Sequence, residues 1–333
     1  MAASVTSGQR NSGYSPAPGF RVTGNASRLW PAALAATAGS VMVGFMPILA
    51  RHLYAEGIGA PSMLWWRYAI ALPALLIAAA VTRLDWIAAW RGGAWRIVLV
   101  GATLGAGQTI CFWESIKTLD TSIAVLLFYT YPALTMLLDR ILFRQPVRSR
   151  SILCVAVILA GAALITLPGL KSGTIDPRGL AWAIPSPLIY VLYLAANSVL
   201  LRRHKPLTGA ISLYLGMALT FGVACLAQGL DIPATPETWL VILFVALGPG
   251  ALTITLFAYS VPRLGPSSYA IIANLELVTV VAVGVTLLGE SVTPARAAGG
   301  LLIVAGIVGY GLLPRRDLAP VPAPAPVIAS EGA

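Results

Sequence analysis

One carboxylate stands in the middle of a long apolar run of this chain and has clear potential for chemistry. Glu276 lies about ten residues into the apolar stretch 267–288, which is long enough to span a bilayer. A charge at that depth is expensive, so such a residue is usually paired, protonated or in contact with a solute. We therefore expect Glu276 to carry a proton or to hold the amine of a solute. The alternative is a structural role, in which a hydrogen-bonded Glu276 stabilises a break in its helix.

Two further charges lie near one membrane surface. Arg67 comes five residues after the start of the apolar stretch 62–82, and Glu114 comes two residues before the end of the stretch 97–116. Both positions are close to the same side of the membrane, so the two side chains could form an ion pair in an outer gate. The alternative is that each side chain reaches separately to water at the interface.

Polar and aromatic residues recur in the middle of the apolar stretches. Tyrosine combines a flat ring, which can hold a cation, with a hydroxyl group, so these residues together predict a partly polar central path for a small solute. For any one of them, an ordinary hydrogen bond between helices is the competing interpretation. The residues are Gln108, Tyr129, Tyr131, Tyr190, Tyr193, Thr253 and Asn274.

Four prolines fall inside apolar stretches. A proline removes a backbone donor and bends its helix, and the freed carbonyls can line a cavity. We expect bends that either allow movement or only shape the bundle. The prolines are Pro132, Pro185, Pro187 and Pro249.

Ten apolar stretches must position these residues. The chain is 58% hydrophobic and 10% charged, and its stretches lack the alternating pattern of a membrane β-barrel. Because backbone polar groups in lipid must be satisfied internally, the stretches should be helices. We predict an all-α integral membrane protein with spans at 29–50, 62–82, 97–116, 121–142, 152–170, 179–201, 208–229, 238–261, 267–288 and 295–313.

The basic residues between the stretches predict the orientation. With the N-terminus in the cytoplasm, sixteen of the 22 Lys and Arg residues fall on the inner side, five fall on the outer side and Arg67 lies within a span. This bias predicts that both termini are cytoplasmic. Residues 1–28 read as a polar cytoplasmic tail and 314–333 as a Pro/Ala-rich one. No stretch forms a basic face for nucleic acid, and the cysteines Cys111, Cys154 and Cys225 read as packing residues.

The ten spans divide into two repeats of five. At a constant offset of 145 positions and without a gap, Gly105 meets Gly250, Phe112 meets Phe257 and Ser115 meets Ser260. Five is odd, so the second repeat enters the membrane in the opposite sense. We predict one repeat at 29–170 and an inverted one at 171–313, an arrangement that recurs in secondary transporters with a site near the midplane.

The stretch 274–310 resembles the second-repeat signature of EamA-type transporters of the drug/metabolite transporter superfamily. Glu276 matches the intramembrane Glu of that family, Gly289 and Glu290 match its Gly-Glu pair, and Gly299, Gly300 and Gly306 match its glycines. Leu277 stands where the family has Pro. In the first repeat, Pro132 is kept, Tyr131 occupies the Glu position, and Gln145 replaces the Glu of Gly-Glu. The resemblance implies that helices 1–4 and 6–9 surround the solute path and that helices 5 and 10 support it.

These observations predict a secondary transporter of a bacterial inner membrane that exports amino acids or similar metabolites by alternating access, with protons as the expected driving ion. An uptake carrier, a passive facilitator, and a non-catalytic receptor or scaffold are the alternatives. The sequence contains no G-x-S-x-G, H-E-x-x-H or Walker-type motif, so we expect no enzyme, no metal and no cofactor. The expected partners are the lipid bilayer and a small solute, and the sequence leaves a homodimer open.

Overall fold

The computed structural model describes residues 26–119, 121–143, 147, 149–167, 176–288 and 293–313. Every regular element in these ranges is a helix. In chain order they are α1 (Ala26–Val43), α2 (Met46–Ala55), α3 (Ala60–Val81), α4 (Trp86–Ala89), η1 (Trp90–Ala94), α5 (Trp95–Val100), η2 (Gly101–Gly105), α6 (Ala106–Ser115), α7 (Thr121–Phe128), α8 (Tyr131–Phe143), α9 (Ser149–Thr166), α10 (Pro177–Ala183), α11 (Pro185–Leu200), η4 (Leu201–Arg203), α12 (Pro206–Gln228), α13 (Pro236–Val245), η5 (Ala246–Leu252), α14 (Thr253–Leu264), α15 (Pro266–Ala273), α16 (Leu275–Leu288) and α17 (Pro294–Gly311).

These elements join into ten helical runs that, within the described part of the chain, are long and apolar enough to cross a membrane. The predicted all-α fold with ten spanning helices is confirmed. The third run begins at Ile87 rather than at residue 97, because it includes the short helix α4, which joins α5 across a kink at Gly93, where φ is 93°. The runs, called spans 1 to 10, are Leu29–Ala55, Ala60–Val81, Ile87–Ser115, Ile123–Leu142, Ser149–Thr166, Pro177–Arg203, Pro206–Gln228, Pro236–Leu264, Pro266–Thr286 and Pro294–Gly311.

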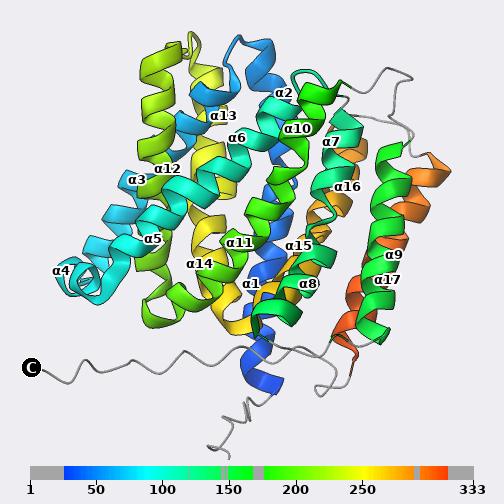
Figure 1. The fold of residues 1–333 in the computed structure, drawn as a ribbon. Coiled ribbons are helices and arrows are strands. Elements are labelled where there is room, and N and C mark those ends of the chain that lie inside the picture. The colour runs from blue at the N-terminus through cyan, green and yellow to red at the C-terminus, as the bar shows by residue number, and fades with distance from the viewer. Residues whose placement is uncertain are drawn as a thin grey trace, which may run out of the picture.

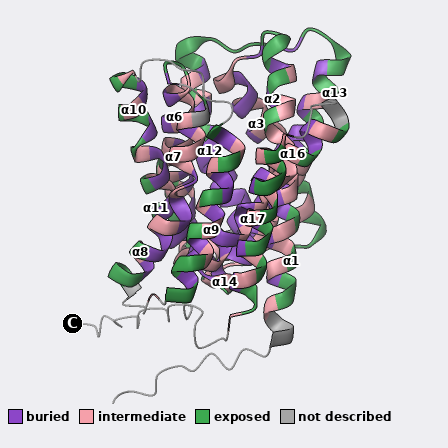
Figure 2. Ribbon diagram, turned by 90° about the vertical axis from the view of Figure 1, so that its right-hand side faces the viewer, coloured by how far each residue is buried: buried purple, intermediate pink, exposed green. Residues whose placement is uncertain are grey.

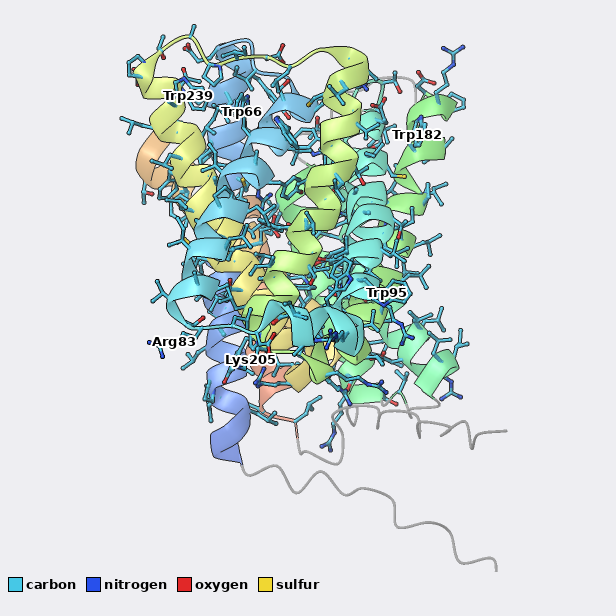
Figure 3. The ribbon with its side chains drawn as sticks, turned by 90° about the vertical axis from the view of Figure 1, so that its left-hand side faces the viewer. Trp66, Arg83, Trp95, Trp182, Lys205 and Trp239 are labelled. Atoms are coloured by element: carbon cyan, nitrogen blue, oxygen red, sulfur yellow. The ribbon has the colours of Figure 1, made fainter. Side chains whose placement is uncertain are left out.

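The spans stand side by side in one bundle (Figure 1). The end of the bundle that holds the start of α1 and the end of α17 is called the terminal end, and the other is called the opposite end. Buried residues gather inside the bundle and exposed ones on its outside (Figure 2), where large apolar side chains such as Leu226 and Leu301 face outward. Arg83 and Lys205 lie toward the terminal end, whereas Trp66, Trp182 and Trp239 lie toward the opposite end (Figure 3).

The two repeats share the irregular parts of their helices. Span 3 contains the π-helical segment η2, and span 8 contains η5, which begins 145 positions later at Ala246. Span 4 breaks at Tyr129 and Thr130, between α7 and α8, and span 9 breaks at Asn274, again 145 positions after Tyr129. A π-helical turn and an interruption of the helix are both uncommon within a membrane-spanning helix. Their recurrence at the predicted offset therefore supports the internal repeat. The predicted boundary at 170/171 lies outside the described residues, as do residues 1–25 and 314–333 of the predicted tails. Residues 26–28, predicted as the end of the first tail, instead form the start of α1.

The pair α9 and α17, spans 5 and 10, packs at one side of the bundle (Figure 1) through a seam of glycines. A Cβ atom added at Gly161 would lie 2.6 Å from the carbonyl oxygen of Gly299, and one added at Gly306 would lie 3.0 Å from that of Cys154. The offset of 145 positions relates Gly161 to Gly306 and Cys154 to Gly299. The two contacts are therefore equivalent, and the seam has approximate twofold symmetry. The glycines let the two backbones approach closely, as small residues do in membrane helix pairs.

We expect Gly299→Ala to destabilise the protein and Gly300→Ala to leave it unchanged or slightly more stable. A methyl group at position 299 would lie 2.6 Å from the Gly161 carbonyl oxygen, whereas at position 300 it would meet no atom within 4 Å. Overpacking costs about 1–3 kcal/mol, while alanine is favoured over glycine in a helix by roughly 1 kcal/mol. Thermal unfolding of the two purified variants in the same detergent measures the difference. Equal unfolding temperatures would contradict the close seam.

Candidate functional site

Glu276 lies in the first turn of α16, directly after the break in span 9. The break follows from Asn274, whose side-chain amide donates to the carbonyl oxygen of Ala270 at 2.7 Å and so competes with the regular backbone pattern. The amide of Leu277 then bonds back to the carbonyl of Asn274 at 3.1 Å. The start of α16 leaves N–H groups without helical partners, and these favour a negative charge nearby. The fold therefore places Glu276 where a carboxylate is locally tolerated in the middle of the bundle.

Arg67 projects from α3 toward the π-helical segment of span 8. Its Nη2 donates to the carbonyl oxygen of Pro249 at 2.7 Å. A π-helical turn changes the regular hydrogen-bond pattern of a helix and recurs at functional sites. The guanidinium carbon lies 5.8 Å from the centre of the Tyr68 ring, and the Tyr214 hydroxyl on α12 is also a hydrogen-bonding neighbour. Arg67 therefore satisfies a carbonyl oxygen of the irregular segment η5 and places a positive charge inside the bundle.

The charges of Arg67 and Glu276 act on each other across the centre of the bundle. Both side chains are only partly buried. The two groups form no direct ion pair, and no hydrogen bond to the Glu276 carboxylate occurs among the residues that the structure describes. A cation and an anion that face the same interior without closing on each other can both bind a ligand with opposite charges.

Aromatic rings surround the carboxylate. The charge of Glu276 acts on Tyr129, Tyr131, Tyr190 and Tyr269, which come from spans 4, 6 and 9. The rings of Tyr131 and Tyr190 are 5.0 Å apart and meet edge to face. Ring faces attract cations. The surroundings of Glu276 are therefore suited to a positively charged group.

A second set of contacts continues the aromatic cluster across the bundle. Tyr190 stacks with Tyr193, Tyr193 stacks with Phe257 at 5.4 Å, and Phe257 meets Tyr269 at 5.2 Å. The hydroxyl of Tyr131 donates to the carbonyl oxygen of Ala270 at 3.2 Å and lies 3.5 Å from the Asn274 amide. The structure therefore brings together six residues that the sequence indicated, together with Arg67: Glu276, Asn274, Tyr129, Tyr131, Tyr190 and Tyr193.

Gln108 and Thr253 have local partners instead. The Gln108 amide donates to the hydroxyl of Thr109 at 2.7 Å, and the Thr253 hydroxyl donates to the carbonyl oxygen of Gly248 at 3.3 Å. The two residues occupy equivalent positions in the two repeats. Their roles in a solute path stay predictions.

The predicted ion pair between Arg67 and Glu114 does not form in this structure. Glu114 pairs with Lys117 at 2.6 Å, about one helical turn further along the chain, while Arg67 donates to the carbonyl oxygen of Pro249. The two residues have similar depths along the membrane, but each side chain has a different partner. The charge of Arg67 acts on Glu276 instead, and the role of Arg67 or Glu114 in an outer gate stays a prediction.

The four prolines lie at or near irregular positions. Pro132 is the second residue of α8, after the break in span 4, and Pro185 and Pro187 lie in the first turn of α11. In a first helical turn the missing N–H removes no helical bond. Pro249 lies inside η5, and its carbonyl oxygen is the one that Arg67 binds. Whether these helices flex there stays a prediction.

The site also contains residues that the sequence did not indicate. Tyr269 lies seven residues before Glu276, and this spacing of about two helical turns could have placed it on the same face. Tyr68 follows Arg67 directly and meets Tyr214 with ring centres 4.9 Å apart. No sequence signal connects Tyr214 to Arg67, because only the packing of α12 against α3 brings them together.

Ten membrane-spanning helices in two inverted repeats, around a charged and aromatic interior, define a multi-pass membrane transport protein. The chain belongs to the EamA-like transporter family, whose profile matches residues 30–167 and 177–312. The resemblance to EamA-type transporters of the drug/metabolite transporter superfamily is thereby confirmed.

Known relatives agree with this class. The threonine/homoserine exporter RhtA of Escherichia coli (strain K12) is 25% identical over 224 residues, which cover 66% of this chain and 72% of RhtA. An uncharacterized transporter of Archaeoglobus fulgidus is 24% identical over 194 residues, covering 58% of this chain and 68% of that protein. One solved crystal structure superimposes with a TM-score of 0.71 at 18% identity, covers 85% of this chain and 99% of its own, and supports the fold alone.

We expect Arg67 and Glu276 to be energetically coupled. Arg67→Met leaves Glu276 without the cation that acts on it, so the unfolding temperature in detergent should fall. Adding Glu276→Gln should recover part of that loss. A double-mutant cycle should give a coupling energy of about 0.5–3 kcal/mol, as for residues in one network.

The matched control for this cycle combines Arg67→Met with Glu114→Gln. Glu114 pairs with Lys117 in the structure, so the effects of these two substitutions should add. Additive effects in the Glu276 cycle, or equal coupling in both cycles, would show that Arg67 and Glu276 do not share a site.

Proposed function

We propose that this chain is a secondary transporter that exports amino acids or similar small metabolites by alternating access, with protons as the driving ion. The observation that carries the proposal is the pair of opposite charges, Arg67 and Glu276, which act on each other inside an aromatic enclosure without forming an ion pair. The printed name of the relative RhtA, a threonine/homoserine exporter, supports the substrate class.

An amino acid fits these groups through both of its charged ends. The planar guanidinium of Arg67 is the side chain best suited to a carboxylate, because it can donate two parallel hydrogen bonds. The ammonium group would then reach Glu276 and the faces of the tyrosine rings around it. Arg67 would keep its bond to Pro249 through Nη2, which fixes the guanidinium before the solute arrives.

Proton coupling follows from what Glu276 can bind. A carboxylate at the centre of a membrane is stable when it is paired with a cation or protonated. The ammonium group of the solute and a proton would therefore exclude each other at Glu276. If the central site carries the solute outward and a proton inward in alternate steps, export of the solute is coupled to entry of protons.

The same orientation supports export from the cytoplasm. The bias of Lys and Arg residues toward the terminal end, where Arg83 and Lys205 lie (Figure 3), supports cytoplasmic termini in a bacterial inner membrane. The inverted repeats would let one central site face either side in turn.

We expect Glu276→Gln to abolish export while leaving insertion into the membrane intact. Glutamine keeps the size of the side chain but can neither bind a proton nor pair with an ammonium group. Mass spectrometry of the medium would compare cells that produce the wild type or the variant at matched membrane levels. Threonine and homoserine would be quantified as specific targets. A solute enriched outside only with the wild type supports the proposal. Normal export by the variant would remove Glu276 from the mechanism, and depletion of a solute from the medium would indicate uptake instead.

We also expect recognition to require both charged ends of the solute. Threonine should compete with radiolabelled threonine for transport into inside-out vesicles, whereas threonine amide and N-acetylthreonine should compete at least about tenfold more weakly. Each analogue leaves a charged group of the site without its partner, and the loss of a hydrogen bond to a charged group costs roughly 1.5–3 kcal/mol. Undiminished competition by the amide would exclude Arg67 as the carboxylate-binding group, and undiminished competition by the acetyl derivative would exclude Glu276 as the ammonium-binding group.

A further inference from the structure

The two ends of the bundle are packed differently, although the repeats share their helices. At the terminal end, α8 of span 4 packs along α15 of span 9. The repeat offset turns this pair into α16 and α7 at the opposite end. Those two helices make at most marginal contact over their described residues. The structure is therefore closed at the terminal end and more open at the opposite end.

Neighbouring helices show the same difference. α14 packs against both α11 and α12 at the terminal end. The equivalent contacts at the opposite end would join α6 to α2 and to α3. Their backbones approach only marginally in the described ranges, and the contact between α6 and α2 is made by side chains, with the Trp113 and Tyr54 rings edge to face at 5.7 Å. The difference therefore involves three pairs of elements at each end rather than one local irregularity.

A buried carboxylate lies in the closed seam between α8 and α15. Asp139 is 3% exposed. Its Oδ2 accepts a hydrogen bond from the hydroxyl of Ser267, and the backbone of Ser267 is a further hydrogen-bonding neighbour. Ser267 is the second residue of α15, where a helix has N–H groups without helical partners. The Oδ1 atom of Asp139 is buried and has no hydrogen-bond partner.

The repeat counterpart of this contact has no carboxylate. The offset of 145 positions converts Asp139 into Gly284 and Ser267 into Ser122. A glycine cannot supply a side-chain acceptor. The chain therefore has a hydrogen bond between Asp139 and Ser267 across the terminal end of the path and cannot form its equivalent at the opposite end.

We propose that Asp139 is a positioning residue that locks the terminal end of the solute path, and that the bond to Ser267 must open each time the central site faces that end. This inference rests on the proposed alternating access. Hydrogen bonds to a charged group are among the stronger ones, and breaking this bond in a dry seam would leave a charge without a partner. When the path opens at the terminal end, water would reach the seam and solvate Asp139. Water would then compete with Ser267 for the carboxylate and weaken the bond between them. The charge of Asp139 acts on Tyr310 of α17, and the Tyr310 hydroxyl lies 3.4 Å from that of Ser268. These interactions connect α17 to the same seam.

Two engineered cysteines at equivalent positions can report the two ends. Thr135 is fully buried in the seam, between Tyr131 and Asp139 on α8. Its repeat counterpart is Val280 on α16, which is partly exposed. Thr135→Cys and Val280→Cys would be made separately in a chain whose three native cysteines are replaced by alanine, and the protein would be placed in lipid nanodiscs, where a soluble maleimide reaches both sides. The native cysteines are Cys111, Cys154 and Cys225.

We expect Asp139→Ala, and separately Ser267→Ala, to change the two reporters in opposite directions. The cysteine at 135 should react about tenfold faster, because losing a hydrogen bond to a charged group shifts an equilibrium by roughly that factor. The cysteine at 280 should react more slowly, because the path closes at the opposite end when it opens at the terminal end. Asp139→Asn keeps an acceptor for Ser267 and should restore most of the original pattern.

The outcomes separate the lock from a general loss of stability and from the proposed substrate. Faster labelling at both positions would indicate loosening of the fold and would overturn the lock, as would unchanged labelling at both. Export of threonine is measured in parallel. Opposite changes in labelling without any export of threonine or homoserine would support the lock and overturn the proposed substrate class.

Discussion

The absence of water inside a bilayer is the constraint on which the rest of this structure depends. Any backbone group released from a helix there must find a partner within the protein. The chain nevertheless interrupts its helices at the centre of the bundle, and each interruption has its own solution. The Asn274 amide binds the carbonyl of Ala270 at the break in span 9, and Arg67 binds the carbonyl of Pro249 in the π-helical segment of span 8. The groups that complete the backbone are thus also the groups that place charge and polarity in the middle of the membrane.

The repeats have the same backbone but different chemistry. Position 276 of the second repeat holds a glutamate where the first has Tyr131, and position 67 of the first holds an arginine where the second has Ser212. The π-helical segments η2 and η5 are related by the common offset, as are the central breaks of spans 4 and 9. Symmetry in the backbone is what the proposed alternation between two packings would use, while differences in the side chains leave one charged centre instead of two. Differences of the same kind at positions 139 and 284 favour one packing over the other.

The sequence predicted the spans, the repeat and most residues of the candidate site, because each of these can be recognised from a short stretch of the chain. A run of about twenty apolar residues is sufficient to identify a span, and a charge such as Glu276 within it is conspicuous. The sequence could not predict the partner of Arg67. Depth is readable from the distance to the end of a span, but the direction of a side chain around the helix axis depends on packing. Asp139 escaped notice because a charge close to the end of a span reads as interfacial, whereas the structure buries it against the start of α15.

The π-helical segments affect how the chain can be redesigned. A π-helical turn adds a residue to a helix without adding a turn, and one extra residue corresponds to a rotation of about 100°. A helical wheel drawn through η2 or η5 would therefore assign the wrong residues to the interior on one side of the segment. Libraries of variants for spans 3 and 8 should be drawn as two separate wheels, one before and one after Gly101–Gly105 and Ala246–Leu252. The same correction applies to any comparison that identifies pore-lining positions of a relative from helical periodicity alone.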